Sequence, residues 1–288
     1  MLKFENTNVM NFDGAIRGVR NPLASWGKAD SYWSYIEDPE TLQTANFEFF
    51  IGENDLDLAK RLCKAGSDHR KFIRQIMVCV DITAPMYWWK QFDTYKVGTV
   101  ANSTSTMHKI HAKEFTLDDF SIEHIDSEEL FQLGTRSNGA TEFALNTDGL
   151  VELTIAVLNH YREKFIETKD KKYWWTLIQL LPSSYNQTRT VTMNFENLFN
   201  MYKSRCEHPH KLDEWSVDFK AWCESLPYFM ELYNATKPVV QETKIEETPA
   251  PKKTRVKKTN VETAEATGEE KPKKTRKSRK KTATEEVA

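Results

Sequence analysis

Aromatic residues are missing from the C-terminal part of the sequence. Residues 234–288 contain no Phe, Tyr or Trp, whereas these residues make up 12% of the whole chain. Lys, Glu, Thr, Ala and Pro dominate that stretch, and such a composition buries too little apolar surface to offset the entropy of an ordered backbone. We therefore predict a folded domain at residues 1–233 and a disordered Lys/Glu/Thr-rich tail at residues 234–288.

Cysteine pairs and long apolar runs are also missing. The four cysteines form no Cys-x-x-Cys pair, so we expect reduced thiols rather than a disulfide framework. No apolar run approaches the roughly 20 residues that span a bilayer, and residues 1–6 carry no signal-peptide hydrophobic core. These absences predict a cytoplasmic protein that contacts no membrane.

The charge is divided unevenly along the chain. The formal net charge is −2, but residues 241–288 hold 14 Lys and Arg against 9 Glu, and the rest holds 26 against 33 acidic residues. Two basic blocks, residues 252–258 and 271–281, form a cationic tail suited to the phosphate backbone of a nucleic acid; the alternative is a tail that only keeps the protein soluble. The tail residues proposed for nucleic-acid contact are Lys252, Lys253, Arg255, Lys273, Lys274, Arg276 and Arg279.

Hydrophobic periodicity predicts helices mixed with a few strands. The predicted helices cover residues 55–65, 86–94, 146–168, 172–180, 195–205 and 212–222, and the predicted strands cover residues 76–82 and 189–193. The first strand is expected to be buried on both faces or nearly so, residues 97–108 are expected to be a loop or irregular segment, and residues 1–50 give no clear element. Helices and strands out of strict alternation indicate the α+β class.

Two segments carry a resemblance to a known family. Residues 84–96 (APMYWWKQFDTYK) begin at the end of a predicted strand and contain a Pro-containing turn and a helix with Gln91. A later segment combines Leu-Pro at residues 181–182, a strand, an Asn-led helix and an arginine. In order and spacing they resemble the ligand-binding segments of the flavin-dependent thymidylate synthases, the ThyX family. The resemblance implies a mixed sheet surrounded by helices, FAD and a uridine nucleotide as ligands, and a homotetramer with ligands at its subunit interfaces.

The same resemblance assigns site residues by position. The flavin would be held by Cys79, Tyr95, Lys96, Asn194, Asn200 and His210, and the nucleotide by Gln91, Asn102 and Arg205. No catalytic protein side chain is expected, because in this family the flavin delivers hydride and the folate carries the carbon. An active enzyme would also need NADPH and methylene-tetrahydrofolate.

The sequence departs from the family where phosphates are held. Residues 94–96 (Thr-Tyr-Lys) replace the family's Arg-His-Arg signature, and Thr106 and Ile178 stand where further arginines are expected. Lys and hydroxyl groups do not reproduce bidentate guanidinium–phosphate contacts. We therefore predict that dUMP methylation is weak or absent. The alternative function is that of a non-catalytic ThyX-fold protein that binds nucleic acid or a protein partner through its tail.

Several smaller patterns have competing explanations. Cys206, His208 and His210 are too close together for a usual zinc site, so we expect no metal. Arg17 and Arg20 either replace the lost arginines at an anion site or are solvated charges of a loop. Gln91 and Arg205 either face a ligand or belong to polar surfaces.

Overall fold

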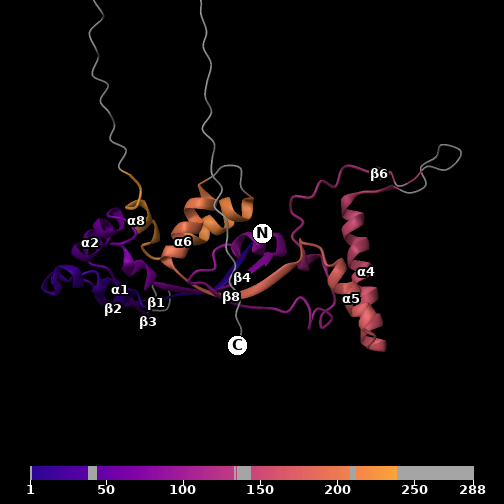
Figure 1. Ribbon diagram of the computed structural model, residues 1–288, viewed down its shortest axis with the longest axis horizontal. Coiled ribbons are helices and arrows are strands. Elements are labelled where there is room, and N and C mark those ends of the chain that lie inside the picture. Colours follow the sequence, from indigo (N-terminus) through magenta and orange to yellow (C-terminus); the bar gives the residue numbers. More distant parts are fainter. Residues whose placement is uncertain (1, 38–43, 133, 135–143, 208–211, 239–288) are drawn as a thin grey trace, which may run out of the picture. The chain divides into compact units, whose positions relative to one another are not determined.

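The computed structural model describes residues 2–37, 44–132, 134, 144–207 and 212–238. Its main sheet has four antiparallel strands in the order β1-β4-β8-β5 (Figure 1). These strands are β1 (Lys3–Met10), β4 (Met77–Pro85), β5 (Val100–Ser103) and β8 (Asn186–Asn194). Two further pairs lie outside this sheet: β2 (Tyr32–Glu37) with β3 (Thr44–Phe50), and β6 (Phe131–Gln132) with β7 (Ala144–Leu145).

Eight α-helices accompany these strands in the described part of the chain. The α-helices are α1 (Phe12–Gly18), α2 (Glu53–Lys64), α3 (Met86–Phe92), α4 (Thr147–Thr168), α5 (Lys171–Leu180), α6 (Phe195–Met201), α7 (Lys220–Ser225) and α8 (Phe229–Asn234). Two π-helices, η5 (Tyr202–Cys206) and η6 (Glu214–Phe219), follow α6 and precede α7. Short 3-10 turns are η1 (Asn21–Leu23), η2 (Trp26–Lys28), η3 (Lys71–Arg74) and η4 (Leu117–Asp119). In the described part of the chain no helix is long and apolar enough to cross a membrane.

The side chains of β4 and β8 alternate between the two faces of the sheet. On β4, Val78, Val80 and Ile82 are fully buried, whereas Cys79 and Asp81 are half-buried on the opposite face. The strand was expected to be buried on both faces or nearly so, and in the structure one face is buried while the other is half-buried. Antiparallel sheets commonly have one face on the core and one facing water. Here the open face carries hydroxyl and carboxylate groups, and Thr190 Oγ1 donates a hydrogen bond to Asp81 Oδ1 over 2.5 Å.

Two hydrophobic clusters form the interior. The larger one joins α1, α2, α3, α6, α7 and α8 to the buried face of the sheet. The smaller one lies around α4 and α5, which run side by side in Figure 1, and its fully buried members are Leu158 and Leu177. The apolar stripe predicted for α4 is only partly covered, because Leu153 on it is 49% exposed.

Most predicted elements are confirmed with shifted ends. Helix α4 begins after Asn146, whose side chain accepts a hydrogen bond from Gly149, and Gly66 after α2 adopts φ +106°, as a helix-ending glycine does. Strand β5 is a correction, because it lies inside the predicted loop at residues 97–108. The sequence also gave no indication of β1, α1, β2 and β3. The tail predicted at 234–288 lies almost entirely outside the described residues, which end at 238.

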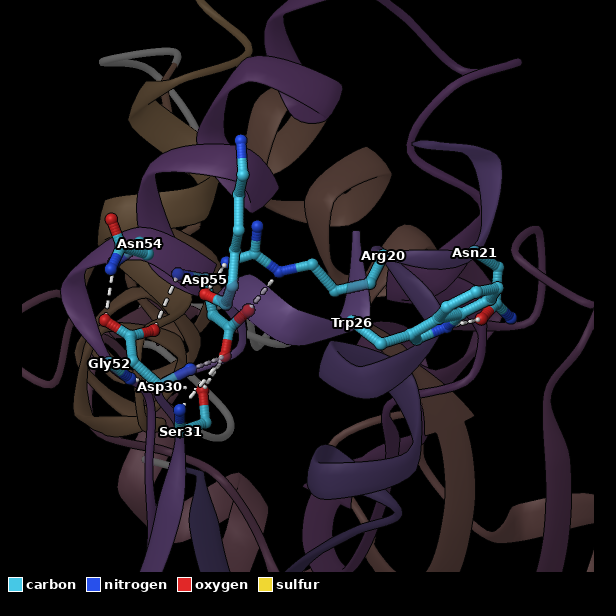
Figure 2. A network of polar contacts seen from close by, with 9 residues as sticks. Arg20, Asn21, Trp26, Asp30, Ser31, Gly52, Asn54 and Asp55 are labelled. Carbon is cyan, nitrogen blue, oxygen red and sulfur yellow. Dashed lines mark hydrogen bonds and ion pairs between the residues drawn. The ribbon is translucent and has the colours of Figure 1, made fainter. Parts of the chain in front are cut away.

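A polar network joins the base of the β2–β3 hairpin to α2 (Figure 2). The carboxylate of Asp55 accepts from Arg20 Nε at 2.6 Å and from Ser31 Oγ at 2.6 Å. Asp30 in turn accepts from the backbone N–H groups of Asn54 and Asp55, and so caps the N-terminus of α2. Burial opposes ionisation of Asp55, but the hydrogen bonds from Ser31 and Arg20 outweigh it and hold its pKa below the ordinary value. Arg20 is thus a buried structural partner, not a solvated loop charge.

Candidate functional site

Gln91 and Arg205 lie in contact, although 114 residues separate them in the sequence. Gln91 is on the last turn of α3, and Arg205 is on the π-helix η5. Arg205 Nη1 donates to Gln91 Oε1 over 3.2 Å. Two of the three residues assigned to the nucleotide by the family resemblance therefore form one cluster, although their role in binding stays a prediction.

Two aromatic residues complete this cluster. Tyr95 Oη accepts from Arg205 Nε over 3.0 Å, and Trp215 Nε1 donates to Gln91 Oε1 over 2.8 Å. The guanidinium carbon of Arg205 lies 5.7 Å from the ring centroids of both Tyr95 and Trp215, within cation–π range. Sequence analysis missed Trp215, and only its place in the apolar stripe of a predicted helix could have drawn attention to it.

The π-helix changes where Arg205 points. A continuous α-helix from Asn194 would bring Arg205, eleven residues later, back to the same face after about three turns. The wider π turns of η5 break that count. Asn194 instead caps α6, accepting from Asn197 N, and Asn197 Oδ1 accepts from Asn194 N in return. Single-turn π-helices often mark functional sites.

The remaining predicted flavin and nucleotide residues are spread more widely. Lys96, Asn102 and Asn200 are exposed. Cys79 is half-buried on the open face of the sheet, between Asn8 of β1 and Thr192 of β8. His210 and the basic tail residues lie outside the described part of the chain. The structure brings together Gln91, Tyr95 and Arg205 but does not place these other residues with them.

A cavity of about 800 Å³ lies next to the Asn194 end of the sheet. Met77, which lines it, is the strand partner of Asn194. Its wall also carries the cationic side chains of Arg17 and Lys71 together with His69. Sequence analysis considered Arg17 but not Lys71 for an anion site. Asp68 also lines the cavity, so its wall carries charges of both signs, and Arg17 and Lys71 are the groups that could meet an anionic part of a large ligand.

A second arginine cluster lies beside α3. Arg189 of β8 donates to Asp93 Oδ1 over 2.8 Å and to Gln187 Oε1 over 2.9 Å. Its guanidinium group lies 4.1 Å from a ring centroid of Trp89. Arg189 was identified in the sequence only as a strand residue, because a single arginine in a strand carries no ligand pattern. Its carboxylate and aromatic partners make it an anchor for the end of α3.

The described residues hold no group of three His, Cys, Asp or Glu side chains able to bind a metal. Cys206 is buried, and burial raises the pKa of its thiol to about 12. In the absence of a metal ion this thiol is therefore protonated at neutral pH.

Comparison with solved structures identifies the fold. A crystal structure of thymidylate synthase X (ThyX) from Helicobacter pylori with FAD and dUMP aligns with a TM-score of 0.52 and 15% sequence identity, over 82% of this chain and 99% of that one. The chain has the ThyX fold.

Two further structures agree with this assignment. A second Helicobacter pylori ThyX structure complexed with FAD and dUMP, and the UMP/dUMP methylase PolB from Streptomyces cacaoi bound with 5-Br dUMP, each align at TM-score 0.51 and 13% identity. They cover 82% of this chain and 99% and 95% of their own chains. The sequence matches no protein-family model, and no curated protein matches it. The chain thus shares the ThyX fold with these proteins at 13–15% sequence identity.

Proposed function

We propose that this ThyX-fold protein binds FAD and a uridine nucleotide, and that it methylates dUMP weakly or not at all. The observation that carries the proposal is the contact between Gln91 and Arg205, which unites the two family segments in one polar cluster. The fold is that of proteins whose structures contain FAD, dUMP or 5-Br dUMP. The chemistry of methylation belongs to the flavin and the folate, so the residues of this chain would bind and orient.

The cavity beside Asn194 is the proposed place for the anionic part of the cofactor. Arg17 and Lys71 on its wall supply positive charge for a pyrophosphate. By contrast, Thr94 and Ile178 offer no charge where the family has arginines. Each missing charge-assisted contact would weaken phosphate binding by about 1.5–3 kcal/mol, which supports the expectation of low turnover with dUMP.

The test is ligand binding by the full-length protein. We expect flavin absorbance after loading with FAD, and binding of UMP or dUMP in calorimetry. Arg205→Ala should weaken nucleotide binding about tenfold or more. Arg61→Ala is the matched control, because Arg61 is exposed on α2 and its ion-pair partner among the described residues is Asp57. Absence of both flavin and nucleotide binding would refute the proposal, and fast thymidylate formation with FAD, NADPH and methylene-tetrahydrofolate would refute the predicted low activity.

A homo-oligomer is part of the same proposal. Helices α4 and α5 expose large apolar side chains, among them Leu150, Leu153, Trp175 and Leu180, each between 47% and 49% exposed. Exposed apolar patches of this kind often mark contacts between chains. Light scattering should give a mass that is a multiple of 33.6 kDa, and a monomer at micromolar concentration would contradict this. A cytoplasmic location stays a prediction.

The basic tail supports a second candidate function, binding of nucleic acid. Its 14 Lys and Arg against 9 Glu give a positive segment on an acidic chain. Affinity should fall steeply with salt, because neutralised phosphates release counterions. Filter binding should compare the full chain with a truncation after Val240. Equal binding by both forms, or none by either at low salt, would leave the tail as a solubility device.

A further inference from the structure

We propose that a second cavity, next to the base of the β2–β3 hairpin, binds a small zwitterion that carries an aromatic ring, such as an aromatic α-amino acid. The cavity has a volume of about 360 Å³ and is lined by residues of α1, η2, β3 and α2 and of the segment that leads into β2. This volume falls within the roughly 300–1,000 Å³ of small-molecule sites in proteins. The inference does not depend on the proposed FAD and nucleotide sites, because this cavity and the one of about 800 Å³ have a single lining residue in common.

The two cavities lie along different sides of α1. Gly14 and Gly18 line the larger cavity, whereas Asp13 and Ile16 line the smaller one, and Arg17 lines both. Asp13, Ile16 and Arg17 are spaced three and four residues apart, so they share one face of the helix. A ligand in the smaller cavity would therefore contact a face of α1 that the larger cavity reaches only at Arg17.

The most deeply buried part of the smaller cavity is an ion pair whose charges cancel. Arg20 and Asp55 both line the cavity, are 4% and 2% exposed, and lie 2.6 Å apart (Figure 2). Asp55 also accepts hydrogen bonds from the backbone N–H and the hydroxyl group of Ser31. Buried charged groups that are paired and hydrogen-bonded hold a fixed geometry. This part of the cavity is therefore preformed and needs no charge from a ligand.

Two further charged side chains of the lining are available to a ligand. Asp13 is half-buried and Arg17 is exposed, and neither makes a hydrogen bond or an ion pair with another residue in the described ranges. Because they are four residues apart on α1, they offer a carboxylate and a guanidinium group to the same cavity. Charge-assisted hydrogen bonds are strong, so the ammonium group of a ligand would pair with Asp13 and its carboxylate with Arg17.

An aromatic wall borders the same cavity. Trp26 lines it although it is 55% exposed, and its Nε1 group donates to Asn21 Oδ1 over 2.9 Å (Figure 2). The apolar lining continues with Phe49, which packs against the larger hydrophobic cluster, and with the buried Ile16. Aromatic rings favour stacked or edge-to-face contacts with other rings. An indole that is held in place beside a cavity therefore suits a ligand with a flat aromatic group.

The balance of charges narrows the class of ligand. The lining holds two positive and two negative side chains, which are Arg17, Arg20, Asp13 and Asp55. A ligand with only an anionic group would meet the carboxylate of Asp13, and one with only a cationic group would meet the guanidinium group of Arg17. Contacts between like charges are unfavourable, whereas a zwitterion pairs with both side chains. Together with the aromatic wall, this balance favours an aromatic α-amino acid.

Three related compounds test this assignment on the unmodified full-length chain. Tryptophan carries the ring and both charged groups, tryptamine lacks the carboxylate, and indole-3-propionate lacks the ammonium group. In calorimetry with and without added FAD, we expect tryptophan to bind with a Kd of about 1 mM or tighter, and both analogues to bind about tenfold or more weakly. Failure of tryptophan to bind, equal binding of all three compounds, or displacement of tryptophan by FAD would overturn the inference. Absence of flavin binding would instead refute the proposed function and leave this inference standing.

Two variants separate direct contacts from a general loss of structure. Asp13→Asn should weaken binding of tryptophan and tryptamine about tenfold but leave indole-3-propionate, which has no ammonium group, unchanged. Trp26→Ala should weaken binding of all three compounds. Asp57→Asn and Leu23→Ala are the matched controls, because Asp57 is an exposed acid on α2, Leu23 is 60% exposed three residues before Trp26, and neither lines the cavity. Wild-type affinity for tryptophan in both Asp13→Asn and Trp26→Ala would place the ligand elsewhere and overturn the inference.

Discussion

Two groups of aromatic residues in this chain have opposite surroundings. Trp88, Trp89 and Trp215 are fully buried beneath the main sheet, whereas Trp33, Tyr35 and Phe47 of the β2–β3 hairpin are 47%, 66% and 52% exposed. Both groups make close ring contacts: Trp88 and Trp215 stack at 4.5 Å, and Trp33 and Phe47 at 5.1 Å. Contact between rings therefore does not by itself distinguish buried core residues from the exposed ladder formed by Trp33, Tyr35 and Phe47.

The two groups are held in place by different means. The buried rings are fixed by packing on all sides within the larger hydrophobic cluster. The exposed rings contact one another across two strands, and a two-stranded ribbon alone is marginally stable. At its base the hairpin is tied to α2 by the polar network in which Ser31 and Asp30 donate to Asp55, and Phe49 packs against the larger hydrophobic cluster. The exposed rings therefore depend on contacts outside the ladder, a buried ion pair among them, as well as on one another.

The largest expected effect comes from removing the centre of that network. Asp55→Ala leaves the buried Arg20 guanidinium without its carboxylate, and breaking a buried pair on one side costs about 3–5 kcal/mol. Asp57→Ala is the matched control on the same helix, because its pair with Arg61 is exposed, and it should change stability by less than about 0.5 kcal/mol. Urea denaturation measures both. Equal losses would show that the network does not anchor the hairpin.

The same carboxylate predicts a pH dependence with a definite sign. The folded pKa of Asp55 is lower than its ordinary value, so the unfolded chain takes up the proton first as pH falls. The stabilisation is present above the unfolded pKa, roughly 4, and is lost as pH falls through the folded pKa. The stability difference between wild type and Asp55→Ala should therefore shrink in acid. A constant difference from pH 7 to acid would contradict the assignment.

An intermediate difference in stability is expected between substitutions at two adjacent buried tryptophans. Trp89 Nε1 donates to the Gln187 carbonyl over 2.9 Å, whereas Trp88 Nε1 is buried with no partner among the described residues. Substitution by Phe removes a similar volume at both positions, but only Trp89→Phe leaves a carbonyl unpaired. We expect Trp89→Phe to cost about 1–2 kcal/mol more than Trp88→Phe in urea denaturation. A larger loss for Trp88→Phe would mean that its N–H is bonded in solution.

Local patterns in the sequence predicted the elements that are buried and regular. Strand β4 and the cap of α6 at Asn194 follow from β-branched runs and from an asparagine before an apolar stripe. Strand β1 was not predicted, because its residues are mostly exposed and rich in Asn and show no alternation of apolar and polar side chains. Strand β5 was not predicted for a similar reason, because all four of its residues are exposed.

Contacts between residues far apart in the sequence limit how much of the candidate site could be predicted from the sequence. The resemblance brought Gln91 and Arg205 forward, but nothing local predicts that Trp215 would donate to Gln91 across 124 residues. The π-helix η5 was equally hidden, since π turns have no clear sequence pattern and alter the face on which Arg205 lies. Positions of this kind depend on packing between distant elements, which periodicity does not encode.

The smallest expected effect concerns the exposed ladder itself. Trp33→Ser and Phe47→Ser remove rings that are about half exposed, and cross-strand pairs of this type contribute roughly 0.2–1 kcal/mol. Each single substitution should therefore cost less than about 1 kcal/mol, and the double mutant should show a coupling of about 0.5 kcal/mol because the two rings share one contact. Urea denaturation of the four forms at two protein concentrations measures this. A loss of stability as large as that of Asp55→Ala, and larger at high protein concentration, would contradict this expectation. It would show that another copy of the chain covers the ladder in solution, because removing one ring costs that much free energy of unfolding only where the ring is buried by association.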